Sequence, residues 1–119
     1  MGLLRRFLDK VGESDDERLA AEITSWAESV PGTCRIASCP MREPVKIAGV
    51  VKRITVFPVQ GKETLEALVT DGTGEMSVAF MGRRAIPGLG LGTRIIVEGV
   101  AGEQRGTRRM VNPSFEFTR

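Results

Sequence analysis

The chain has 119 residues, which is enough for one domain with a buried core but too few for two. It holds 17 basic and 15 acidic residues, a formal net charge of +2, and no histidine. No apolar run approaches the length that a membrane span requires and no signal peptide is visible, so we expect a cytoplasmic single-domain protein without a membrane partner.

The two signs of charge are unevenly divided along the chain. Up to Val30 there are four basic and seven acidic residues, a balance of −3, and the remainder has a balance of +5. An acidic front joined to a basic remainder predicts separate roles for the two parts. The basic part is suited to attract a polyanion.

The acidic front is predicted to be helical. Ser14 and Glu17 have the spacing of a capping box, in which each side chain bonds the backbone N–H of the other residue. The helix is expected to end before Pro31, because proline cannot continue it. An apolar stripe at helical spacing follows the cap, formed by Leu19, Ile23, Trp26 and Val30. A shorter amphipathic segment precedes the cap, with apolar residues Leu3, Leu4, Phe7, Leu8 and Val11.

This extension, residues 1–30, has two interpretations. Its apolar stripes pack on the rest of the protein or on each other, or they bind a protein partner or a second copy of the chain. The apolar character of residues 3–8 motivates the second interpretation. Residues 31–44 are predicted to be a connecting segment.

Two cysteines, Cys34 and Cys39, lie in the connecting segment. Without histidine or further cysteines, one chain cannot complete a tetrahedral zinc site from soft ligands, and no base is at hand to activate a thiol. We expect reduced structural thiols, with redox switching and a metal bridge within an oligomer as alternatives. The sequence therefore predicts no metal, no cofactor and no enzymatic activity.

From Val45 onward, apolar and polar residues alternate in short runs, as in strands with one buried face. The first run, residues 45–57, contains Gly49, where we expect a bulge or sharp bend. Pro58 and Gly61 then predict a loop over residues 56–63.

A hairpin is expected at the centre of this region. Two alternating runs flank Asp71-Gly72-Thr73-Gly74, in which the aspartate bonds its own backbone and each glycine accepts a positive φ. A link rich in glycine and proline follows at residues 82–92, and then a strand pair, 95–101 and 108–117, whose second member Asn112-Pro113 interrupts. The buried positions of the hairpin are predicted to be Leu65, Ala67, Val69, Met76, Val78 and Phe80.

Five strands in this order are typical of an OB barrel. Four segments also resemble the wedge-type OB domain of RecG-like helicases and small stand-alone bacterial OB proteins that bind nucleic acid: VKIAGVV, LEALVTDGTGEMSVAFM, GLGTRIIVEGV and MVNPSFEF. The resemblance covers roughly residues 36–117. The chain is therefore predicted to be mainly β, a five-stranded OB-fold barrel over residues 45–118 with an N-terminal α-helical extension.

Binding of nucleic acid on an OB face needs basic loops beside the phosphates and aromatic side chains for the bases. The three loops that flank this face are predicted at residues 56–63, 82–92 and 102–107. Basic residues lie in or next to each loop, and Phe57 is the best stacking candidate. Together they form the predicted binding site: Lys52, Arg53, Phe57, Lys62, Arg83, Arg84, Arg105, Arg108 and Arg109. Glu66 and Glu75 on the same face are expected to repel phosphate.

These residues predict weak binding of single-stranded or branched DNA or RNA, with little sequence preference, driven by counterion release from the phosphates. The alternative is a protein-interaction module that docks a partner through outward-facing Leu68 and Met81 or through the N-terminal helices. A further hypothesis is that the acidic extension folds over the basic loops and masks them.

Overall fold

The computed structural model describes residues 17–118, so the expected segment at residues 3–11 and the Ser14 cap lie outside the described residues. A helix over residues 17–29 leads into a connecting segment with one 3-10 turn, η1 (Ile36–Ser38). The strands that follow are β1 (Pro44–Val59), β2 (Lys62–Thr70), β3 (Glu75–Met81), β4 (Arg94–Gln104), β5 (Thr107–Val111) and β6 (Ser114–Thr118). The prediction that the helix ends before Pro31 is confirmed.

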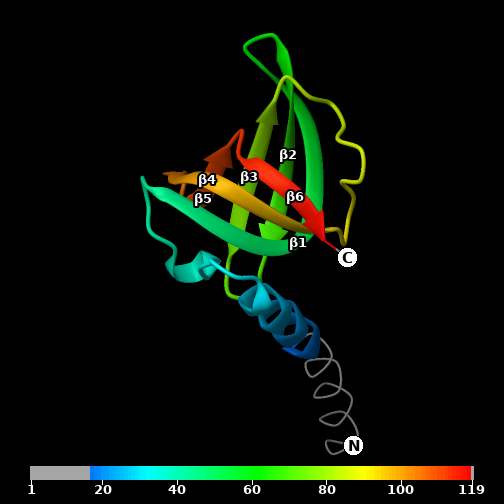
Figure 1. Ribbon diagram of the computed structural model, residues 1–119. Helices are drawn as coiled ribbons and strands as arrows, with labels where there is room; N and C mark the ends of the chain where they lie inside the picture. Colours follow the sequence, from blue (N-terminus) through cyan, green and yellow to red (C-terminus); the bar gives the residue numbers. More distant parts are fainter. Residues whose placement is uncertain (1–16, 119) are drawn as a thin grey trace, which may run out of the picture.

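The strands close into a ring of five, shown in Figure 1. β1 pairs with β2, β2 with β3, β5 with β4 and β4 with β1, all antiparallel, whereas β3 and β5 are parallel. β6 pairs with the first half of β4. The predicted order of a long strand, a hairpin, a link and a second hairpin is confirmed, and the last strand is divided into β5 and β6 at Asn112-Pro113 as expected.

Alternating side chains fill the interior of the ring. The six predicted buried positions of the β2–β3 hairpin are all at most 4% exposed. Ile47, Ile95 and Val97 from β1 and β4 are fully buried in the same core. Phe115 of β6 extends the core through an edge-on contact with Phe80, with ring centroids 5.2 Å apart. The alternation therefore identified the buried face correctly.

The bulge in β1 lies at Lys52 and not at Gly49. The register passes from Val51 opposite Val69 to Arg53 opposite Leu68, which leaves Lys52 as the extra residue. Gly49 serves a different purpose, because a Cβ there would lie 2.7 Å from the carbonyl oxygen of Thr70. The expected bulge at Gly49 was therefore wrong. Glycine is needed at this position because the backbone of Thr70 lies too close for a side chain.

Two of the three expected loops are tight hairpin turns. β1 and β2 continue to Gln60-Gly61, with φ angles of 52° and 78°, and β4 and β5 continue to Arg105-Gly106, with 54° and 78°. Positive φ at both central residues is the type I′ geometry, whose twist matches the flanking strands. The open loops predicted at 56–63 and 102–107 were therefore wrong in form, and only the link from β3 to β4 is long.

The helix over residues 17–29 packs on the outside of β1 and β4, near the β2–β3 turn (Figure 1). Ala27 is buried against Ala48 and Ile96, with Trp26 and Val30 beside them. The guanidinium of Arg94 lies 4.9 Å from the centre of the Trp26 ring. Of the predicted apolar stripe, Trp26 and Val30 pack on the strands, whereas Leu19 is 58% exposed. The buried residue of the described helix is Ala27, which the predicted stripe did not include. No helix within residues 17–118 is long and apolar enough to cross a membrane.

Asp71 joins the β2–β3 turn to the connecting segment. Its Oδ1 accepts hydrogen bonds from the backbone N–H and the hydroxyl of Thr73, at 2.9 and 2.6 Å, and its Oδ2 accepts from the Ile36 N–H at 2.9 Å. The prediction that Asp71 bonds its own turn is confirmed. The contact with Ile36 could not be predicted, because it joins residues far apart in the sequence.

The two thiols of the connecting segment lie close to the core and are not joined by a disulfide. Burial raises the pKa of Cys34, and the neighbouring Cys39 raises it further. Burial also raises the pKa of Cys39, while Arg108 opposes that rise. Thiols held in the protonated form are poor nucleophiles, which fits a structural role.

Candidate functional site

The outer face of the ring carries a row of side chains that crosses four strands. Arg53 of β1 lies opposite Leu68 of β2, Leu68 lies opposite Ser77 of β3, and Ser77 is next to Arg109 of β5. Residues paired in this way point to the same side of a sheet. The bulge at Lys52 puts Arg53 into this row, because it shifts the alternation of β1 by one residue.

A hollow of about 360 Å³ opens over this row, on the outside of β2 and β3. Four of the nine predicted site residues meet there: Arg53, Phe57, Arg105 and Arg109. The other lining residues are Glu66, Leu68, Ser77, Gln104 and Thr107. Half-buried Phe57 and Leu68 supply apolar contact area and the arginines supply charge, so the hollow combines the two kinds of group that a nucleotide requires.

The charges around the hollow are unequally satisfied. Arg109 donates from Nη1 to Oε1 of Gln104, and its Nη2 lies 3.9 Å from a carboxylate oxygen of Glu66. Within residues 17–118, the guanidinium groups of Arg53 and Arg105 make neither a hydrogen bond nor an ion pair. These two cations are therefore available to an external anion.

Both acids that were expected to repel phosphate have a basic neighbour. Glu66 has Arg109, and Glu75 accepts a hydrogen bond from Nζ of Lys52 at 2.8 Å. The exposed Lys52–Glu75 pair contributes little to stability, and the Arg109–Glu66 pair is partly buried. They do reduce the negative potential of the face.

Arg108 is directed away from the hollow. It is in register with fully buried Met76, and its Nη2 donates to the carbonyl oxygen of Ala37 at 3.0 Å. Arg108 and Arg109 are consecutive residues of one strand, so they point to opposite sides of it. The structure thus assigns Arg108 a contact with the connecting segment.

The remaining predicted residues lie outside the hollow. Lys62 begins β2 opposite Val59, at the far end of the β1–β2 hairpin. Arg83 and Arg84 start the long link, and the Nε of Arg84 lies 2.9 Å from a carboxylate oxygen of Glu63. These basic residues therefore lie near the tip of β2, outside the hollow.

The most informative residue that the sequence did not single out is Ser77. Its side chain is 7% exposed, and its hydroxyl has no hydrogen-bond partner among residues 17–118. The buried Nε of Arg109, its neighbour, is also unpaired. Buried polar groups without partners are rare and each costs about 1–3 kcal/mol. The strand alternation placed Ser77 on the outer face, but only the structure shows that it lies beneath a hollow.

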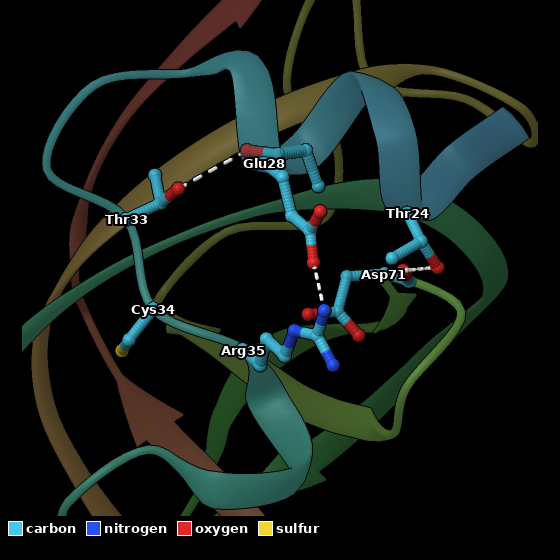
Figure 2. Close-up of a pocket in the computed structure, with 7 residues that line it drawn as sticks. Thr24, Glu28, Thr33, Cys34, Arg35 and Asp71 are labelled. Carbon is cyan, nitrogen blue, oxygen red and sulfur yellow. Dashed lines mark hydrogen bonds and ion pairs between the residues drawn. The ribbon is translucent and has the colours of Figure 1, made fainter. Parts of the chain in front are cut away.

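A second cavity, of about 300 Å³, lies where the helix meets the ring. Figure 2 shows Glu28 of the helix facing Arg35 of the connecting segment, with which it forms an ion pair. Thr24 donates to the carbonyl oxygen of Asp71 at 2.8 Å, and Cys34 lines another side. None of the nine predicted site residues lines this cavity. It is a junction held by internal hydrogen bonds.

No family model matches the chain, and no curated protein matches it. A solved structure that does match is that of a replication protein A heterotrimer bound to ssDNA, with a TM-score of 0.53 and 13% identity. The match covers 76% of this chain and 68% of that chain. At this identity the likeness shows the fold alone. Because replication protein A is built of OB folds, the ring has an OB-like fold, and no relation to RecG-like helicases is supported.

Proposed function

We propose that this protein binds single-stranded nucleic acid on the outer face of β2 and β3, without catalysing a reaction. The observation that carries the proposal is the meeting of Arg53, Phe57, Arg105 and Arg109 around one hollow. The three arginines come from two regions that are distant in sequence, β1 and the β4–β5 hairpin, yet they form one cationic rim beside the ring of Phe57. The likeness to a protein whose structure contains ssDNA supports the same reading.

The mechanism is mainly electrostatic. Phosphates contact the unpaired guanidinium groups of Arg53 and Arg105, and the release of condensed counterions supplies most of the affinity. Phe57 adds base stacking, which tolerates any sequence because every base has a π face. Lys62, Arg83 and Arg84 extend the basic track towards the tip of β2. Binding is therefore weak, salt-dependent and sequence-tolerant, for DNA or RNA, and includes the single-stranded parts of branched molecules.

The test is fluorescence anisotropy of a labelled oligonucleotide, single-stranded against duplex, over a salt series. With wild type, we expect preference for the single strand. Each neutralised phosphate contributes about 0.7 to the slope of log K against log salt. The double variant Arg53→Gln/Arg105→Gln should lower the slope by about 1.4 and the low-salt affinity by about tenfold.

The matched control is Arg42→Gln/Arg94→Gln. Both arginines are exposed and neither lines the hollow, so the control removes the same net charge elsewhere. It should bind nearly as wild type does. If both double variants lose affinity equally, binding follows net charge alone and the hollow is not the site.

A protein-interaction role is the second candidate. The observation that favours it is exposed apolar surface beside the hollow, where Met81 is 38% exposed and Val111 is 49% exposed. A folded wild-type sample that binds no oligonucleotide at low salt would favour this candidate. Met81→Lys/Val111→Lys should then abolish partner binding while Arg53→Gln/Arg105→Gln leaves it intact.

A further inference from the structure

The floor of the hollow contains an unusual combination of groups. Leu68 forms an apolar surface beside Ser77, whose buried hydroxyl has no partner among residues 17–118. The Nε of Arg109 on the other side of Ser77 is likewise unpaired. A surface that only follows a phosphate backbone needs neither an apolar floor nor a hidden hydroxyl.

We infer that the hollow is a pocket for one unstacked base of the bound strand, an inference that rests on the proposed function and adds a base site to it. The base lies over Leu68 and Phe57, and the Ser77 hydroxyl and the Nε–H of Arg109 bond its polar edge. Its flanking phosphates contact Arg53 and Arg105 at the rim. The volume of about 360 Å³ is at the small end of ligand sites, which suits a single base.

This geometry also predicts that the pocket does not distinguish one base from another. A serine hydroxyl both donates and accepts, so it can bond the edge of any base. The pocket therefore requires a base without selecting its identity, and the required contact is compatible with sequence-tolerant binding.

The first part of the test compares two strands of equal charge. One is oligothymidylate about 12 nucleotides long, and the other is an abasic backbone of the same length, which keeps the phosphates and lacks the bases. Wild type should bind the abasic strand about tenfold more weakly, with the same salt slope. Equal affinity for the two strands would overturn the base pocket and leave the electrostatic function standing. Failure to bind either strand would reject the proposed function itself.

The second part fills the pocket. Ser77→Leu should weaken oligothymidylate binding about tenfold and leave binding of the abasic strand unchanged. The matched control is Ser114→Leu, the same exchange on an exposed position of β6 that does not line the hollow. It should bind both strands as wild type does.

Since a larger side chain at Ser77 can disturb β3, a second variant addresses the same pocket. Leu68→Gln removes the apolar floor at a half-buried position and should also weaken only the base-bearing strand. Circular dichroism checks that each variant is folded. A folded Ser77→Leu or Leu68→Gln protein with wild-type affinity for oligothymidylate would overturn the inference.

Discussion

At the scale of single residues, Arg105 has an unusual backbone conformation. It has a φ of 54° at the first central position of a type I′ turn, where asparagine and glycine are preferred. Residues in such conformations often lie at functional sites. Here the strained residue places its guanidinium at the rim of the hollow. The free-energy cost of the backbone conformation is thus linked to the proposed binding of phosphate.

Arg105→Asn is therefore expected to separate stability from binding. Asparagine tolerates the left-handed conformation, so the free energy of unfolding should rise by about 1 kcal/mol. Oligonucleotide affinity should fall, because a cation is lost from the rim. Urea denaturation measures the first quantity and anisotropy the second.

The other hairpin provides the control. Gln60 has a φ of 52° in an equivalent turn and does not line the hollow. Gln60→Asn should raise stability by a similar amount and leave affinity unchanged. A loss of stability in both variants would show that the turns are not strained in the way their φ angles indicate.

At the scale of elements, the helix over residues 17–29 packs closely against the β2–β3 turn. A Cβ on Gly72 would lie 2.2 Å from the Thr24 hydroxyl oxygen and 2.5 Å from the carbonyl oxygen of Ala20. Gly72 also has a φ of 85°, which a residue with a side chain rarely adopts. The helix can therefore pack this closely on the turn only because residue 72 is a glycine.

Gly72→Ala should displace the helix while the ring remains folded. Trp26 packs against Ala48 and Ile96 through that helix, so its fluorescence emission should shift to the red. Gly82→Ala is the matched control, because Gly82 has a φ of 78° but nothing within 4 Å of the added Cβ. An equal emission shift in both variants would mean that backbone strain, and not the lost contact, releases the helix.

How much the sequence predicts also differs between elements. The strands and their buried faces were predictable, because period-two alternation is a local signal that Leu65 through Phe80 display clearly. The position of the bulge and the tightness of the turns were not predictable, because a glycine indicates an unusual backbone conformation but not which one. The opposite directions of Arg108 and Arg109 follow from alternation alone, yet the hydrogen bond that holds Arg108 requires the folded connecting segment. The hollow depends on pairing between β1, β2, β3 and β5, and no local pattern encodes it.

At the scale of the whole molecule, the acidic helix and the hollow lie on different parts of the ring. The described helix packs on β1 and β4, whereas the hollow opens over β2 and β3, and none of residues 17–30 lines it. At physiological salt, charges farther apart than about 8 Å are largely screened. The described helix therefore does not cover the hollow.

We accordingly expect Glu17→Gln/Glu22→Gln to leave oligonucleotide affinity within about twofold at physiological salt. Glu66→Gln, inside the hollow, should tighten binding, because it removes a negative charge and frees Arg109 from its carboxylate neighbour. Anisotropy measures both variants. Tighter binding by the helix variant would revive the hypothesis that the acidic extension masks the site.

The bulge at Lys52 decides which side chains of β1 face the core and which face the hollow. Before Lys52 the odd-numbered side chains Val45, Ile47 and Val51 face the core, and after it the even-numbered Ile54 does. The core-facing positions are therefore odd-numbered in the first half of the strand and even-numbered in the second half. Removing Lys52 would remove the bulge and leave every side chain on its present face, because Val51 and Arg53 would then be consecutive residues that point to opposite sides. Loss of the bulge with Lys52 retained would instead turn Arg53 and Phe57 inward and put Ile54 on the surface. The outward direction of Arg53 and Phe57 thus depends on the strand keeping this bulge for as long as Lys52 is present.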